Sequence, residues 1–145
     1  IVFNPSPIDE SIFRLPLGEA WLLIFNEIEG GALAGCDDEE GILNTLRRRW
    51  PRCRLLLTLG SHGCVYDDGQ RRLRQGIYQA ETVDTTAAGD TFTGYFVACM
   101  AAGRPEEECL DLASRAAAIA VSRPGAAPSI PTMDEVQRCT LRRGE

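Results

Sequence analysis

Short apolar runs, each ending at residues that favour turns, alternate with longer segments of helical character along this chain. Three runs, at residues 1–3, 21–25 and 55–59, are rich in aliphatic and aromatic side chains and predict strands. The third is apolar except for Thr58 and stops at Gly60, which is typical of a strand buried on both faces in a parallel sheet. The pattern therefore predicts a sheet of short, buried strands.

Two further strands are predicted on either side of a tight turn. Cys64–Tyr66 is apolar, residues 67–70 are Asp-Asp-Gly-Gln, and an arginine-rich segment continues to about Gln79. An Asp-Gly pair between two such segments is a signal for a hairpin. Three arginines of the second strand are expected to alternate onto a solvated face, with an anion-binding role as the alternative: Arg71, Arg72 and Arg74.

Three segments have the composition of helices. Residues 37–49 begin with acidic and end with basic side chains, which complements the helix dipole, and we expect a solvated helix with no further role. Residues 87–102 are almost entirely apolar and stop at Gly103, a typical C-terminal cap. A third helix begins with Pro105 at its first position and carries four alanines that allow close packing: Ala113, Ala116, Ala117 and Ala120. Strands alternating with helices predict an α/β sandwich with a mainly parallel sheet.

The composition narrows the chemistry that this chain can perform. Over 145 residues the formal net charge is −6, which argues against a nucleic-acid partner held by a basic surface. All 15 basic residues are arginines, so a lysine Schiff base and a lysine-bearing Walker loop are excluded within this chain. The single histidine, His62, excludes a two-histidine metal site. Carboxylates, hydroxyls, thiols and backbone amides remain as the reactive groups.

The six cysteines are expected to be reduced packing residues. They form no CxxC pair, and several lie within apolar runs, as buried thiols do in a reducing cytoplasm. No apolar run approaches the ~18 to 20 residues of a membrane span, and no signal peptide is visible. We therefore expect a cytoplasmic protein with no membrane partner.

The most informative segment for function lies between Val83 and Gly94, where two threonines and several small residues precede the long apolar helix. The threonines can cap the helix, and the small side chains at 87–89 let a ligand approach the backbone. Exposed N–H groups and the helix dipole then favour an anion. Asp90, in the same turn, is either a helix cap or a carboxylate placed to take a proton from a hydroxyl beside a phosphate.

Four motifs together resemble the ribokinase-like carbohydrate kinases, also called the PfkB family. Residues 84–90 (Asp-Thr-Thr-Ala-Ala-Gly-Asp) are similar to the family's C-terminal signature, and residues 26–29 (Asn-Glu-Ile-Glu) to its Asn-x-x-Glu element. Residues 58–63 (Thr-Leu-Gly-Ser-His-Gly) resemble its Thr-Leu-Gly-x-x-Gly turn, and residues 123–131 resemble the tail of its ribokinase branch. The resemblance implies a Rossmann-like, three-layer α/β fold and ATP-dependent phosphorylation of a sugar hydroxyl.

The resemblance assigns the catalytic step to the start of the long apolar helix. Asp90 would be the general base that accepts the proton of the sugar hydroxyl. Backbone N–H groups would form an anion hole for the phosphoryl group in transfer, and they belong to Ala87, Ala88, Gly89 and Asp90.

The nucleotide and its metal are assigned to other matching positions. Asn26 and Glu29 would organise Mg²⁺ and its waters around the phosphates of ATP. Residues of the Thr-Leu-Gly turn would contact those phosphates, and a serine of the last helix would line the adenine pocket: Thr58, Gly60, Ser61 and Ser114. His62 is interpreted as a surface residue.

The resemblance also implies a site for a monovalent cation, usually K⁺, beside the anion hole. Asp84 and Ser129 belong to the two loops that would hold it, and four residues would contribute carbonyl oxygens: Thr86, Ala120, Arg123 and Gly125. From the residues alone, the alternative for Asp84 is a plain turn aspartate; the matching tail favours the cation site.

Family members also have an N-terminal half with a Gly-Gly signature, a sugar-binding aspartate and a β-sheet lid, and this sequence contains none of them. We therefore expect residues 1–145 to be the C-terminal nucleotide-binding and catalytic portion of a longer kinase domain, inactive alone, whose intact form is a candidate homodimer. The small-molecule partner is expected to be a sugar. Two alternatives remain: another family kinase, acting on fructose, ketodeoxygluconate or a nucleoside, and a non-catalytic nucleotide-binding module.

Overall fold

The computed structural model describes residues 1–144, and the contacts within it divide the chain into two compact units. The first unit is Ile1–Arg74, and the second begins at Gln75. Within the described residues, the first unit holds most of a five-stranded sheet with two α-helices, and the second holds three α-helices.

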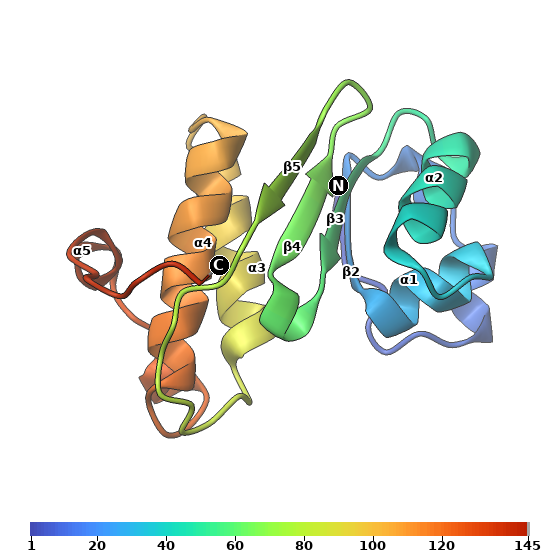
Figure 1. The fold of residues 1–145 in the computed structure, drawn as a ribbon. Coiled ribbons are helices and arrows are strands. Elements are labelled where there is room, and N and C mark those ends of the chain that lie inside the picture. Colours follow the sequence, from blue (N-terminus) through green and yellow to red (C-terminus); the bar gives the residue numbers. More distant parts are fainter. Residues whose placement is uncertain (145) are drawn as a thin grey trace. The chain divides into compact units, whose positions relative to one another are not determined.

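The strands lie in the sheet in the order in which they occur along the chain. The parallel strands β1 to β3 are in register, with Leu22 between Val2 and Arg54, whereas β4 is antiparallel to β3 (Figure 1). The predicted mainly parallel α/β arrangement is thus confirmed. The strands are β1 (Val2–Phe3), β2 (Leu22–Asn26), β3 (Arg54–Thr58), β4 (Cys64–Asp67) and β5 (Arg72–Gln75).

The two central strands form the middle of the core of the first unit. Residues 22–25 are 2% exposed or less, and residues 55–57 are fully buried, as continuous apolar runs require. Helices α1 (Glu27–Ala34) and α2 (Glu39–Arg49) lie along one face of this sheet (Figure 1). Apolar side chains from strands and helices meet there, including Phe25, Leu33, Ile42 and Leu57.

Helix α2 agrees with its sequence-based prediction at both ends. Its N-cap is Asp38, whose carboxylate accepts the Gly41 N–H at 2.7 Å, and it ends with three arginines. It is not free of a further role, however, because its charged side chains bind the hairpin. Arg72 donates to Glu40 at 2.8 Å, and Arg74 forms an ion pair with Glu39.

The second strand of the hairpin is shorter than predicted. β5 ends at Gln75, whereas the arginine-rich pattern predicts a strand to about Gln79. Beyond β5 the chain pairs with the C-terminal tail instead: Tyr78 bridges Arg143, and the Gln79 N–H donates to the Arg142 carbonyl at 2.8 Å. The strand-like residues that follow Gln75 therefore form this isolated bridge and do not extend β5 in the sheet.

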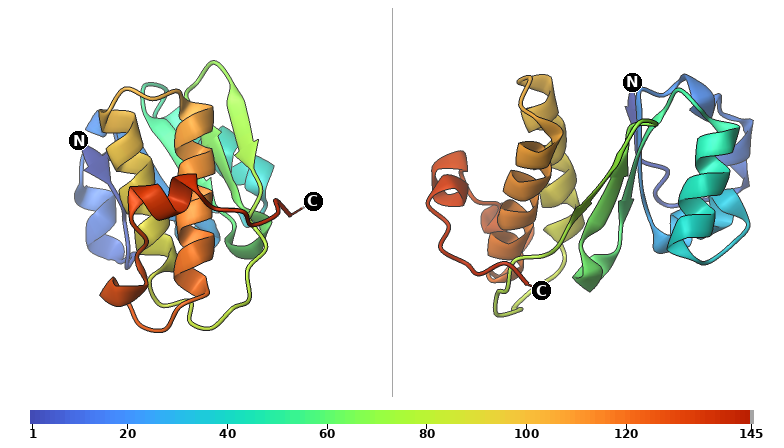
Figure 2. Two further views of the ribbon diagram at one scale, coloured as in Figure 1. Left: turned by 90° about the vertical axis from the view of Figure 1, so that its left-hand side faces the viewer. Right: turned by 45° about the horizontal axis from the view of Figure 1, so that its top comes forward.

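The second unit is built on two long helices that lie side by side, α3 (Ala88–Ala101) and α4 (Glu106–Val121), with α5 (Met133–Gln137) against α4 (Figure 2). Three of the four predicted small residues of α4 are at most 1% exposed, and Ala117 is half-buried. Small side chains let the two helix backbones approach closely. Gly103, with φ of +74°, ends α3 as predicted.

Two predicted helix starts differ from the structure. Pro105 is the N-cap of α4 rather than its first helical residue. The threonines do not cap α3, because Ala87 is its N-cap and the Thr86 hydroxyl donates to Asp84 at 2.5 Å. Four short 3₁₀ turns complete the described chain: Glu10–Arg14, Leu17–Glu19, Gly60–His62 and Ala127–Ser129.

The cysteines are free thiols, four of them buried. Cys109 is fully buried in α4, and burial raises its pKa to about 11, so its reactive thiolate form is scarce near neutral pH. This agrees with the prediction of packing residues. Among residues 1–144, no helix combines the length and apolar character needed to cross a bilayer.

Candidate functional site

The predicted site residues divide between the two units. In the first unit they begin where β2 passes into α1. Asn26 is the N-cap of α1, and its side-chain oxygen accepts the Glu29 N–H at 2.9 Å. The Glu29 carboxylate in turn accepts the Asn26 N–H at 2.9 Å. This reciprocal pair is a capping box, which satisfies two N–H groups at the start of the helix.

The second part of this group lies beside it, at the end of β3. Thr58 is the register partner of Asn26, so the carboxyl ends of the two parallel strands are neighbours. The chain then enters the 3₁₀ turn through Gly60, whose φ of +52° favours glycine. Gly60 and Ser61 are exposed. The structure thus brings together five predicted residues at one edge of the sheet, the usual place for ligands in open α/β sheets: Asn26, Glu29, Thr58, Gly60 and Ser61.

This edge fits a magnesium ion held mainly by a nucleotide. No cluster of three His, Cys, Asp or Glu side chains occurs in the described chain, so a cage made only of carboxylates and imidazoles is absent there. The capping box uses one oxygen of Glu29 and the amide oxygen of Asn26, which leaves the other carboxylate oxygen of a 6% exposed glutamate. One or two carboxylates, with waters and substrate phosphates, is the ligand set that Mg²⁺ prefers.

In the second unit, Asp84 joins two loops. One carboxylate oxygen accepts the Thr86 N–H at 2.9 Å and the Thr86 hydroxyl, and the other accepts the Gly125 N–H at 3.0 Å. The bonds from Thr86, followed by that from Gly125, lower the pKa of Asp84. The Asp84 N–H donates to the Val121 carbonyl at 3.1 Å. The loop before α3 is therefore fastened to the segment that follows α4.

The set of residues predicted for a monovalent cation is partly assembled by these contacts. The Asp84–Gly125 bond connects its two loops. Ser129 is 1% exposed, and its hydroxyl donates to the Ala126 carbonyl at 2.7 Å. The Ala120 carbonyl already accepts the Arg123 N–H at 3.1 Å. A carboxylate and several carbonyl oxygens are the hard donors that suit K⁺, so the residues present fit such an ion.

The start of α3 carries the predicted catalytic residues. Asp90 is in its first turn and exposed, and a Cβ added at Gly89 would meet no heavy atom within 4 Å. A ligand can therefore approach this backbone. The Ala88 N–H donates to the Thr85 carbonyl at 3.2 Å, so the neighbouring amides of Gly89 and Asp90 are better placed to bind an anion. The adjacent Thr91 hydroxyl is buried without a partner among the described residues.

Ser114 is not at an open surface. It lies in α4 and is 7% exposed. Only a small part of its surface is therefore accessible for the predicted contact with an adenine ring.

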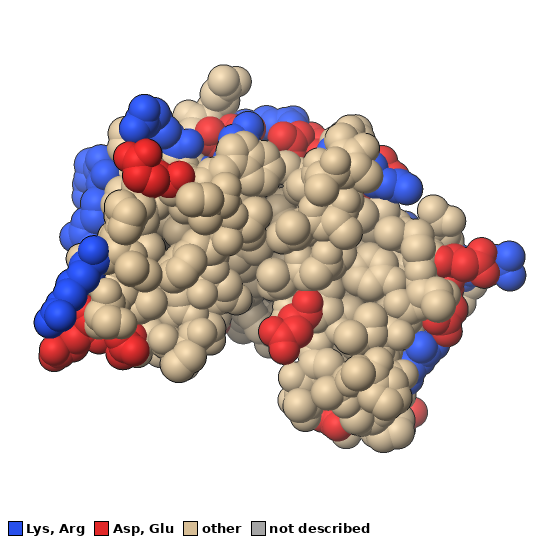
Figure 3. Space-filling view, turned by 180° about the vertical axis from the view of Figure 1, so that it is seen from behind, with Lys and Arg blue, Asp and Glu red and all other residues tan. Residues whose placement is uncertain are grey.

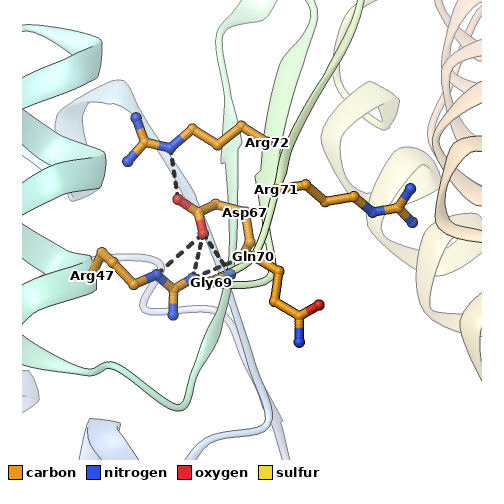
Figure 4. Close-up of a pocket in the computed structure, with 6 residues that line it drawn as sticks. All are labelled: Arg47, Asp67, Gly69, Gln70, Arg71 and Arg72. Atoms are coloured by element: carbon orange, nitrogen blue, oxygen red, sulfur yellow. Dashed lines mark hydrogen bonds and ion pairs between the residues drawn. The ribbon is translucent and has the colours of Figure 1, made fainter.

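A cavity of about 230 Å³ lies elsewhere in the first unit, and the sequence pointed to no function for it beyond the alternative anion role (Figure 4). Asp67 is one of the residues that line it; this carboxylate is 3% exposed and accepts bonds from Arg72 at 2.7 Å and from Arg47 at 2.6 Å. Burial alone would raise the pKa of Asp67, but the bonds from Arg72, Gly69 and Arg47 outweigh it and lower the pKa. Arg71 points away from this carboxylate (Figure 4).

Arg47 and Arg72 are thus matched by Asp67, which favours the expected structural role of these arginines over anion binding. Figure 3 shows a face that is mostly uncharged, with blue arginines beside red carboxylates along its edges. The sequence contains a local signal for this group of charged residues around Asp67. Asp67 begins the Asp-Asp-Gly turn and is followed by three arginines within seven residues. The partner Arg47, twenty residues away, is not visible from local pattern.

The chain resembles one known protein family over most of its length. The pattern of the pfkB family carbohydrate kinases matches residues 1–133. The chain is 44% identical to ribokinase of Schizosaccharomyces pombe over 94% of its own length and 45% of that protein. It is 42% identical to ribokinase of Arabidopsis thaliana over 94% of its length and 38% of that protein. The chain therefore spans less than half the length of these curated relatives.

Solved structures give the same result. The structure of Arabidopsis thaliana ribokinase with ribose and ATP matches with a TM-score of 0.75 and 36% identity, over 81% of this chain and 39% of that one. Ribokinase of Giardia lamblia matches with a TM-score of 0.84 and 26% identity, over 94% of this chain and 49% of that one. The fold is that of ribokinases.

Proposed function

Because this chain belongs to the pfkB family of carbohydrate kinases, we propose that it is the nucleotide-binding and catalytic portion of an enzyme that transfers a phosphoryl group from ATP to a sugar hydroxyl. The observation that carries the proposal is the exposed Asp90 carboxylate in the first turn of α3, beside an open backbone at Gly89. A helix N-terminus attracts phosphate, and a carboxylate there can accept a proton from an adjacent hydroxyl.

In this proposal Asp90 acts as the general base. It removes the proton of the sugar hydroxyl as that oxygen forms a bond to the γ-phosphorus and the bond between this phosphorus and ADP breaks. Charge on the phosphoryl oxygens is stabilised by the N–H groups at the start of α3, with those of Gly89 and Asp90 best placed. Such transfer depends on positioning and charge stabilisation more than on covalent help from the protein.

The nucleotide phosphates are assigned to the edge of the sheet formed by Asn26, Thr58 and Gly60. Mg²⁺ bound with ATP would neutralise charge on the phosphates. Glu29 would accept from its water ligands through the carboxylate oxygen that the capping box leaves available, and Asn26 through the second lone pair of its amide oxygen. The capping box holds both side chains in one geometry, so they are already oriented for the ligand before it binds.

A monovalent cation is proposed to lie between the loops that Asp84 fastens. The ion would draw oxygen donors of both loops, already connected by the bond from Gly125 to Asp84, around itself and keep the turn before α3 in the anion-binding conformation. Potassium suits carbonyl and carboxylate donors in loops of this kind.

The acceptor is proposed to be ribose or a related sugar. Two relatives named ribokinase are 44% and 42% identical and four others 32–34%, while Fructokinase-1 of Oryza sativa is 33% identical over 81% of the chain. Fructose, ketodeoxygluconate and nucleosides are the alternative acceptors. A cytoplasmic location and a homodimer of the intact protein belong to the same proposal.

The test is an assay of ADP release by the longest natural polypeptide that contains this chain, with a panel of pentoses, hexoses and nucleosides. Release that depends on ribose is the expected result. ATP binding without acceptor-dependent turnover for any compound would instead favour a non-catalytic nucleotide-binding module.

A further inference from the structure

The segment between α4 and α5, residues 122–131, is held by side-chain bonds to three other parts of the second unit. In the loop before α3, the Asp84 carboxylate accepts the Gly125 N–H at 3.0 Å. In α3 itself, the Tyr95 hydroxyl donates to the Pro131 carbonyl at 2.5 Å. The third contact comes from α5, and it is an ion pair.

Glu135 makes this ion pair from the first turn of α5. One of its carboxylate oxygens accepts a bond from the Arg123 guanidinium at 2.6 Å, twelve residues away in the chain. The other oxygen accepts the Thr132 N–H at 2.7 Å, and the Thr132 hydroxyl accepts the Glu135 N–H at 3.4 Å, which completes a capping box. One glutamate therefore fixes both the start of its own helix and the beginning of the segment that precedes it.

The ion pair acts on the same short stretch of chain as the bond to Asp84. Arg123 is two residues before Gly125, and Pro124 between them has a fixed φ. The Arg123 N–H donates to the Ala120 carbonyl at 3.1 Å, which ties this residue to the end of α4. With its guanidinium held at α5 and its N–H at α4, Arg123 sets the direction in which the chain continues to Gly125.

We propose that Glu135 is a positioning residue. Acting through Arg123, it holds Gly125 at the Asp84 carboxylate and thereby keeps the turn before α3 in its anion-binding conformation. The inference rests on the proposed function, because that function assigns the anion hole and the monovalent cation to these loops. The paired side chains are 35% and 41% exposed, so water screens the ion pair and its effect on global stability is small. Its effect on the direction of the loop is local.

Two substitutions separate the ion pair from the capping box. Glu135→Gln keeps an oxygen that can accept the Thr132 N–H, because glutamine also serves in a capping box, but it removes the charge that pairs with Arg123. Arg123→Gln removes the other charge and keeps the backbone groups of that residue. Asp134→Asn is the matched control, since it removes one negative charge from the same helix, where Asp134 pairs with Arg138 at 3.1 Å.

The first readout is hydrogen–deuterium exchange, resolved to single residues, in the longest natural polypeptide that contains this chain. Pro124 has no N–H, which separates the signal of Gly125 from that of its neighbour. We expect Glu135→Gln to speed exchange of the Gly125 N–H by about 2- to 5-fold, as loss of one exposed ion pair implies, and Asp134→Asn to leave it unchanged. Combining Glu135→Gln with Arg123→Gln should add nothing, because the two residues act as one unit.

The second readout is the K⁺ dependence of ADP release by the same polypeptide. Glu135→Gln should raise the K⁺ concentration at half-maximal activation by about 2- to 5-fold, because the loop is less often in the conformation that binds the ion. At saturating K⁺, kcat should be close to that of the natural protein. A glutamate that only stabilised the fold would lower Tm without moving this concentration.

Four results would overturn the proposal. Equal exchange of the Gly125 N–H in Glu135→Gln and Asp134→Asn would do so even where the proposed function stands. Additive effects of Glu135→Gln and Arg123→Gln would show that Glu135 does not act through Arg123. Faster exchange with an unchanged K⁺ dependence would refute the positioning role. Absence of acceptor-dependent ADP release in the natural protein would refute the proposed function and the positioning role together.

Discussion

Replacing Asp67 by asparagine should destabilise the first unit by about 2–3 kcal/mol, because this buried carboxylate joins the hairpin to α2. Its oxygens accept bonds from Arg47 at 2.6 and 3.1 Å, from Arg72 at 2.7 Å and from the Gly69 N–H at 2.8 Å. Asparagine has nearly the same shape, so the change removes charge without creating a cavity.

The magnitude follows from what each arginine retains. Removing one partner of a buried ion pair typically costs about 3–5 kcal/mol. Here Arg47 keeps bonds to the carbonyls of Pro51, Cys53 and residue 67, and Arg72 keeps Glu40 and Asn44. Arg47 and Arg72 are also 18% and 30% exposed, so water partly replaces the lost contact. Both facts bring the cost below that range, to about 2–3 kcal/mol.

Urea denaturation followed by tryptophan fluorescence measures the effect, and thermal unfolding should show a Tm lower by about 6–9 °C. Asp134→Asn is the control, because the Asp134–Arg138 pair is exposed and should contribute about 0.5 kcal/mol or less. A loss for Asp67→Asn no greater than that of the control would refute the reasoning.

The same carboxylate gives a pH dependence with a defined sign. The pKa of Asp67 is lower in the folded chain than its ordinary value of 3.8, so the folded state favours the ionised form. Its contribution is fully present above pH 3.8, and it is lost as the pH falls from there through the lowered folded pKa. The difference in stability between the natural chain and Asp67→Asn should therefore shrink below that pH.

The remaining predictions concern catalysis. In the intact enzyme, Asp90→Asn should lower kcat by ~10²- to 10⁴-fold with little change in ATP affinity, and a near-normal kcat would remove Asp90 from the mechanism. Potassium should raise activity and sodium or lithium should do so poorly, so equal rates in potassium and sodium would refute the cation site. The 145-residue chain alone should release no ADP in the presence of sugars, because displacing the acceptor by about 1 Å can cost ~10²-fold and the sugar-binding residues are expected outside this chain. Turnover at a normal kinase rate by the isolated chain would contradict that prediction.

The sequence predicted the buried strands well because their apolar runs are local signals. Residues 55–57 are fully buried, and β3 (Arg54–Thr58) begins and ends within one residue of the strand predicted at 55–59. The predicted end of β5 was wrong because Tyr78 and Gln79, which follow the strand, pair with Arg143 and Arg142, more than sixty residues away. The predicted threonine cap was wrong for a similar reason, since Asp84 takes the Thr86 hydroxyl. Competition between partners is invisible when residues are considered one at a time.

Asn26 and Glu29 show why a functional motif and a structural one can occupy the same positions. A side chain that must face a ligand has to be held still, and an N-cap holds asparagine by a bond to the backbone of its own helix. The cap uses the amide oxygen of Asn26 and one oxygen of Glu29, and acceptor capacity remains for a ligand's waters at the second lone pair of that amide oxygen and at the other Glu29 oxygen. The Asn-x-x-Glu spacing suits both purposes because it is the spacing of a capping box. Loss of either residue should therefore disturb the start of α1 as well as the site, and a kinetic defect in such variants is interpretable only alongside a measurement of helix stability.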